Sequence, residues 1–162
     1  MSRITKSWRW LREVVIWSSW LAGIGIGFMM LVTCTDVLLR RFGLSVPGAY
    51  DMVRLAGGIT IAAALPITTA VKGHVAIEHF FHQLSYRNRM IVDSVMRTLQ
   101  VIAFSFAACG FVQRGQSLLR DGEVTPTLQC PTYWVAWVIA AACALTAVVS
   151  LFHLIRPREE LL

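Results

Sequence analysis

The 162-residue chain has little charge, and long stretches of it have none. Asp, Glu, Lys and Arg make up 15% of the residues, against roughly a quarter in a typical soluble domain. None of the four occurs at positions 14–35, 55–71 or 124–155. Such runs lack the polar stripe of a surface helix, and a hydrocarbon layer of roughly 30 Å needs about 20 apolar residues in a helix. The scarcity of charge therefore excludes a soluble protein and indicates a membrane protein.

The C-x-x-C spacing is absent, although the chain has four cysteines. Cys34, Cys109 and Cys143 lie within or at the edge of apolar runs, where a thiol behaves as a small hydrophobe. Cys130 is the only one in a polar connection. This spacing predicts neither a disulfide framework nor a zinc site. Whether Cys34 and Cys130 ever pair is left open by the sequence.

A signal-peptide cleavage motif is lacking at the N-terminus. Basic residues do precede the first apolar run, as they would in a cleaved signal. The run from Val14 to Thr35 is longer than the usual hydrophobic region of a signal, however, and no A-x-A site closes it. We therefore expect a retained first span.

Four apolar segments are present, and each is predicted to be a membrane-spanning helix. They cover residues 14–38, 50–71, 90–112 and 132–155. A turn containing Pro and Gly separates the first two, and a polar connection at 113–130 separates the last two. The predicted fold is an all-α integral membrane protein, a single membrane domain over residues 1–162, with four transmembrane helices arranged as two hairpins.

Basic residues distinguish the two sides of this arrangement. The N-terminus, the central segment and the C-terminus together hold nine: Arg3, Lys6, Arg9, Arg12, Lys72, Arg87, Arg89, Arg156 and Arg158. The other two connections hold four: Arg40, Arg41, Arg114 and Arg120. The positive-inside rule then places both termini and the central segment in the cytoplasm. Because these residues sit at the ends of apolar runs, they indicate orientation in a bilayer and no nucleic-acid partner.

The central segment, residues 72–89, concentrates polar residues between the two hairpins. We interpret it as an amphipathic helix at the cytoplasmic interface, in which Val75, Ile77, Phe80, Phe81 and Leu84 enter the headgroup region. Gly73, His74 and Glu78 belong to this interfacial segment.

Histidines in the chain leave two alternatives to consider. His74, Glu78 and His82 would share one helical face, a possible metal site, but no matching ligand set occurs elsewhere. Bis-histidine haem ligation needs histidines deep in facing spans, whereas only His153 lies in a span, near its end. We therefore predict no metal, no cofactor and no catalytic residue.

Small residues and charge pairs mark candidate contact surfaces. Gly23 and Gly27, four residues apart, would let another helix approach closely. A second small-residue face comprises Ala136, Ala140 and Ala144. Near the ends of the first hairpin lie two acid–base pairs, Asp36 with Arg40 and Asp51 with Arg54. We predict that these four charged residues form a polar cluster that fixes the hairpin and contacts another subunit or another protein partner. The alternative is that they are unlinked charges whose long side chains reach toward water.

No charge is expected near the middle of any span, where a transporter acting alone would bind substrate and ion. The chain therefore has the features of a subunit that supports a larger membrane partner.

Four short motifs, in this order and spacing, resemble a known family. They are Asp36-Val-Leu-Leu-Arg-Arg-Phe42, then Pro47 followed by Asp51, then Gly73-His-Val-Ala-Ile-Glu78, and finally Leu128-Gln-Cys-Pro-Thr-Tyr-Trp134. The sequence is similar here to the small membrane subunit of tripartite ATP-independent periplasmic (TRAP) transporters. Arg41 stands where an aromatic is common in that family, and Asp51 where Glu is common.

The resemblance implies a role that composition cannot show. A periplasmic binding protein captures an organic acid, such as a dicarboxylate or sugar acid, and delivers it to a large membrane subunit driven by the sodium gradient. The small subunit braces the large one and helps to dock the binding protein. The alternative is a membrane anchor or scaffold subunit of a redox enzyme complex. The substrate cannot be inferred, because recognition would reside in the other two components.

Overall fold

The computed structural model describes residues 2–70 and 86–155, and within these ranges the chain forms four α-helices. They are α1 (Ser2–Arg40), α2 (Ala49–Ala70), α4 (Tyr86–Asp121) and α5 (Tyr133–Ile155). Each contains a stretch long and apolar enough to cross a membrane. The prediction of an all-helical protein with four candidate spans is therefore confirmed. The interfacial segment predicted around Gly73, His74 and Glu78 lies outside the described residues.

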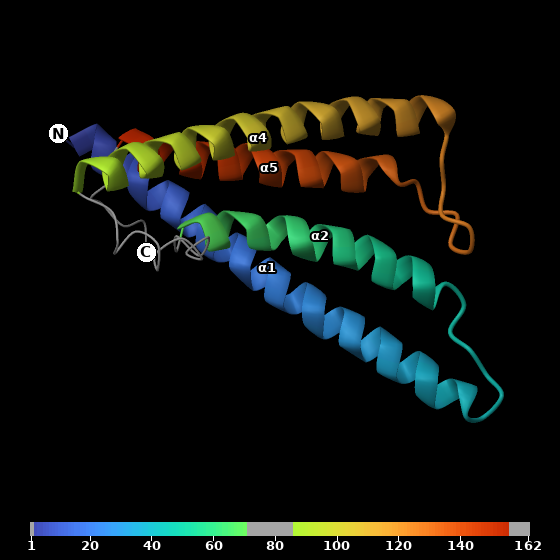
Figure 1. Cartoon of the computed structure of the whole chain (residues 1–162). Helices are drawn as coiled ribbons and strands as arrows, with labels where there is room; N and C mark the ends of the chain where they lie inside the picture. Colours follow the sequence, from blue (N-terminus) through green and yellow to red (C-terminus); the bar gives the residue numbers. More distant parts are fainter. Residues whose placement is uncertain (1, 71–85, 156–162) are drawn as a thin grey trace.

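Figure 1 shows the helices as two antiparallel hairpins, α1 with α2 and α4 with α5. The hairpins meet where α2 packs against α5. The two connections, residues 41–48 and 122–132, lie at the same end of the molecule (Figure 1). The start of α1, the end of α2, the start of α4 and the end of α5 lie at the opposite end. The two hairpins therefore point the same way along the long axis of the molecule, with both connecting loops at one end (Figure 1).

Two helices extend beyond their predicted spans. α1 begins at Ser2, well before position 14, because residues 2–13 contain no Pro or Gly to interrupt it. The third predicted span was expected to end at position 112, but α4 continues to Asp121. Its stop is Gly122, which has φ +63° and lets the Glu123 N–H donate to the Leu118 carbonyl at 3.2 Å. The prediction of a connection from 113 is thus wrong, because the intervening residues are compatible with a helix.

The lengths of these helices exceed what a bilayer requires. At 39 and 36 residues, α1 and α4 measure about 58 and 54 Å at 1.5 Å per residue. A hydrocarbon layer of roughly 30 Å would cover only part of either helix unless it tilts strongly. Each must therefore tilt or project into the headgroup region and beyond.

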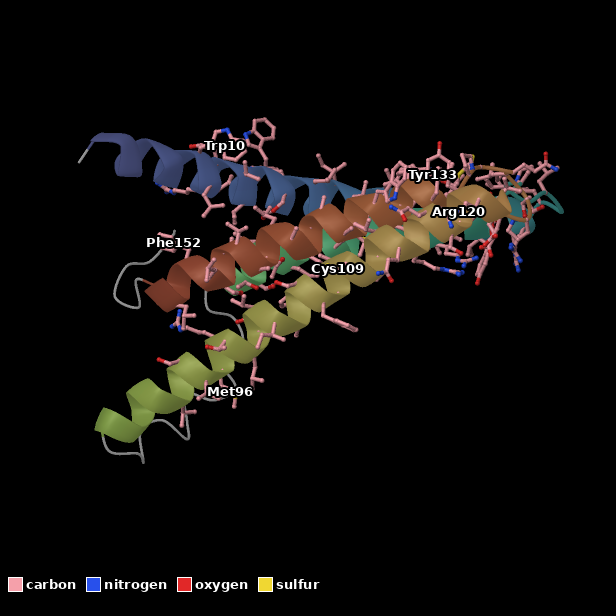
Figure 2. The ribbon with its side chains drawn as sticks, turned by 90° about the horizontal axis from the view of Figure 1, so that it is seen from above. Trp10, Met96, Cys109, Arg120, Tyr133 and Phe152 are labelled. Atoms are coloured by element: carbon pink, nitrogen blue, oxygen red, sulfur yellow. The ribbon has the colours of Figure 1, made fainter. Side chains whose placement is uncertain are left out.

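The interior of the molecule is thin and made mainly of small side chains. Val15, Ala70 and Val149 form a buried cluster where α1, α2 and α5 meet. Within its most apolar stretch, α5 has 44% of its residues buried, whereas α4 has none. From above, Figure 2 shows α4 diverging from α1 toward Met96. The helices α1 and α4 therefore present long apolar surfaces that the described part of this chain does not cover.

Candidate functional site

A polar contact that joins the two hairpins lies at their loop ends and centres on Asp51. This residue is in the first turn of α2, yet it is only 1% exposed. Its Oδ2 accepts hydrogen bonds from the backbone N–H groups of Thr127, at 2.8 Å, and Leu128, at 3.1 Å. Two N–H donors and the nearby N-terminus of α2 stabilise the buried carboxylate. We call Asp51, Thr127 and Leu128 the Asp51 clasp, because together they tie the first hairpin to the loop of the second.

The loop 122–132 folds on itself around Thr125, which is buried. The Thr125 N–H donates to the Cys130 carbonyl at 2.9 Å, and the Cys130 N–H donates to the Thr125 hydroxyl at 3.1 Å. Gln129, with φ 51°, reverses the chain, and its N–H donates to the Thr125 carbonyl at 3.1 Å. These bonds occupy the inner polar groups of the loop, so that the Thr127 and Leu128 N–H groups remain to bind Asp51.

Gly48, just before α2, makes room for the clasp. Its φ of +77° lies in the left-handed region, which a side chain disfavours. A Cβ at this position would also lie 2.6 Å from Leu128 Cγ. The Gly48 carbonyl accepts the Met52 N–H at 2.9 Å and so begins the hydrogen-bond ladder of α2. Both backbone conformation and close packing therefore require glycine here.

Asp36 performs a similar task within the first hairpin. Its Oδ2 accepts from Arg40 Nε at 2.8 Å, and its Oδ1 accepts from the Val46 N–H at 3.0 Å. The carboxylate thereby attaches the turn 41–48 to the last turns of α1. Arg40 remains largely exposed, with 67% of its side chain accessible.

The four predicted charged residues thus fall into two local arrangements. Asp36 and Arg40 hold the α1–α2 turn, while Asp51 holds the second hairpin. Arg54 is exposed, and its positive charge acts favourably on the Asp51 carboxylate. A contact between these residues and another subunit stays a prediction. The sequence analysis did not identify the loop 122–132 as the partner of Asp51. The signal that could have indicated it is the polar turn at Thr125–Thr127, which precedes an apolar span.

The glycines of α1 do not all have the predicted environment. A Cβ at Gly25 would collide with the Thr60 hydroxyl of α2 and lie 3.2 Å from Thr60 Cβ. Beyond the adjoining residues and backbone of α1 itself, a Cβ at Gly23 or Gly27 would meet no atom of the described chain within 4 Å. Gly25 is therefore the close-approach residue between α1 and α2. Packing of Gly23 and Gly27 stays a prediction that concerns other surfaces.

The three alanines predicted to form a packing face on α5 also differ in their surroundings. Ala136 and Ala140 are buried, whereas Ala144 is exposed. A tight contact between α4 and α5 occurs at Gly115, where a Cβ would collide with the Trp137 ring. Trp137 also packs edge-on against Tyr133, with ring centroids 5.3 Å apart. These contacts fix the second hairpin near the loop 122–132, the end that carries the Tyr133 label in Figure 2.

The Asp36 and Asp51 carboxylates hold the backbone of the two loops in place and do not bring reactive side chains together. Within residues 2–70 and 86–155, no group of three or more His, Cys, Asp or Glu could hold a metal ion. The candidate metal ligands His74, Glu78 and His82 lie outside the described residues. Both buried carboxylates are engaged by N–H donors, as described above. The site can therefore hold two hairpins and two loops in fixed relation.

Comparison with known proteins gave a family match. The family model for the DctQ component of tripartite ATP-independent periplasmic transporters matches residues 29–160. This range contains Asp36, the Asp51 clasp and the loop 122–132, whereas Gly23 and Gly27 precede it. No curated protein and no solved structure matches the chain.

Proposed function

Because the chain belongs to the DctQ family of TRAP transporter components, and so is a transport protein rather than an enzyme, we propose the finer role that follows. The chain is the small subunit of a sodium-driven transporter for an organic acid. It braces the large transport subunit and helps to dock the periplasmic binding protein. The family is one of multi-pass inner-membrane proteins, which agrees with the four candidate spans. This assignment favours transport over the alternative of a redox-enzyme anchor.

The observation that carries the proposal is the family match over most of the chain. A physical argument supports the bracing role. The most apolar stretch of α4 has no buried residue, and α1 exposes many large side chains, among them Trp17, Ile24 and Leu31. Lipid tails can cover such a surface, and so can the helices of a large membrane subunit. Membership of the DctQ family implies that a large membrane subunit covers part of this surface.

Orientation is part of the proposal. The connections 41–48 and 122–132 lie together at one end of the molecule (Figure 1). The end with the start of α1 adjoins the more basic parts of the sequence, so the positive-inside rule supports a cytoplasmic location for both termini. The Asp51 clasp would then lie on the periplasmic side, where a binding protein delivers its ligand. We propose that residues 1–162 act there as a single membrane domain.

The test is reconstitution of uptake. The large subunit and the binding protein are placed with or without this chain in proteoliposomes, and entry of a labelled organic acid is followed under an inward sodium gradient. We expect uptake only when all three components and sodium are present. Potassium in place of sodium is the matched control.

Three results would contradict the proposal in whole or in part. Equal uptake without this chain would remove the requirement for a small subunit. Transport of a solute by this chain alone would show that it is not a supporting subunit. Uptake driven equally by potassium would leave the bracing role but reject sodium coupling.

A further inference from the structure

The first hairpin ends in a surface whose exposed charge is entirely positive. Residues 36–54 contain two carboxylates, Asp36 and Asp51, and both are buried. The three arginines of the same stretch, Arg40, Arg41 and Arg54, are exposed. The exposed charged groups of this stretch are therefore all guanidinium groups, of which Arg40 is paired with Asp36 and Arg54 acts on the Asp51 carboxylate.

Large apolar side chains stand among these arginines. Phe42 is 78% exposed and Tyr50 is 76% exposed, and Leu44 is also exposed. All three lie between the end of one candidate span, at Arg41, and the first turn of the next, which begins at Ala49. Such a mixture of aromatic and cationic side chains at a span end is the composition found at the headgroup level of a bilayer.

The second hairpin offers a contrast at the same end of the molecule. Its exposed arginines, Arg114 and Arg120, are accompanied by exposed Asp121 and Glu123. Arg114 lies 3.8 Å from Glu123. The exposed charges of this loop therefore balance, while those of the first hairpin do not.

We propose that residues 40–54 form a binding surface for the headgroup of an anionic phospholipid. The guanidinium groups of Arg41 and Arg54 donate to the lipid phosphate, and Arg40 adds charge with the N–H groups not used by Asp36. Phe42 and Tyr50 insert beside the glycerol backbone of the lipid. A lipid fits better than an acidic protein surface because exposed Phe and Leu side chains adjoin the span ends directly, where acyl chains are available to cover them. This inference is independent of the transport role.

The experiment uses the full-length chain in detergent, with phosphatidylglycerol or zwitterionic phosphatidylethanolamine added. Retained lipid is measured by native mass spectrometry. The test variant carries Arg41→Gln and Arg54→Gln, and the matched control carries Arg114→Gln and Arg120→Gln. We expect phosphatidylglycerol affinity to fall roughly fivefold for each arginine removed from the first hairpin, and to change little in the control. A third variant, Arg41→Lys with Arg54→Lys, should retain most of the affinity, and a thermal unfolding scan verifies that each variant is folded.

Three results would overturn the proposal. One is equal retention of the two lipids by the unsubstituted chain. Another is an equal loss in the test and control variants, which would reflect net charge alone. The last is unchanged lipid retention in the test variant. If a parallel binding assay then shows that this variant captures the periplasmic binding protein less well, the surface belongs to an acidic protein partner.

Discussion

The Asp51 carboxylate accepts the Thr127 backbone N–H at 2.8 Å, although 76 positions separate the two residues in the chain. Together with the Leu128 N–H, this contact connects the start of α2 to the loop that precedes α5. On the side of α2 the Asp51 carboxylate is buried, whereas Thr127 is exposed. The relative position of the two hairpins at this end depends on that contact.

Replacement of Asp51 by Ala should destabilise the folded chain by about 2–4 kcal/mol, because two N–H groups would lose their acceptor. Thermal unfolding in detergent measures this effect, and the loop 122–132 should become more sensitive to protease. Asp121→Ala is the control, because Asp121 is exposed and its carboxylate accepts from the Ser117 hydroxyl of its own helix. Equal stability of the two variants would contradict the role of the clasp.

Gly48→Ala should be more destabilising than Gly43→Ala. Both glycines have positive φ, +77° and +75°, so each substitution has a conformational cost of about 1–2 kcal/mol. Only at Gly48 would the new Cβ meet Leu128, and this overpacking adds about 1–3 kcal/mol. Unfolding temperatures of the two variants give the comparison.

The double variant Gly48→Ala with Leu128→Ala separates the two contributions. Removal of the Leu128 branch should restore part of the stability lost in Gly48→Ala, with the strain of the positive φ remaining. If the free energy of unfolding lost in the double variant equals or exceeds the summed losses of the two single variants, steric conflict with Leu128 is not the cause.

Gly115→Ala and Gly110→Ala should have opposite effects, although both lie inside α4. At Gly115 the methyl group would collide with the Trp137 ring, whereas at Gly110 no atom of the described chain lies within 4 Å. Ala in place of an unconstrained helical Gly stabilises by about 0.5–1 kcal/mol. We therefore expect a higher unfolding temperature for Gly110→Ala and a lower one for Gly115→Ala. A similar increase for both would show that Trp137 does not pack there.

Gly27→Leu tests the predicted small-residue contact against the large subunit. Because a Cβ at Gly27 would meet no atom beyond its own stretch of helix within 4 Å, the isolated chain should not lose stability, and the loss of a helical Gly should raise its unfolding temperature slightly. If another helix approaches Gly27 in the complex, this close packing should be lost and co-purification with the large subunit should fall sharply. Gly110→Leu is the control on α4. Full co-purification of the Gly27 variant would reject the predicted contact.

Much of the fold was predictable because it depends on composition along the chain. The uncharged runs at 14–35 and 133–155 must satisfy their backbone internally, which in a bilayer means helices. The ends of the helices were less predictable. Where α4 stops depends on the single glycine at 122, because the preceding polar residues are as compatible with a helix as with a connection.

Sequence alone determined that the chain would have four apolar helices with acidic and basic residues near their ends. The tertiary structure decided which glycines make contacts within the chain, namely Gly25 and Gly115, while contacts of Gly23 and Gly27 with other surfaces stay a prediction. It also decided that Asp51 would serve the second hairpin. The reason is geometric: the rotation of each helix about its axis, and hydrogen bonds between distant residues, arise only when the helices pack.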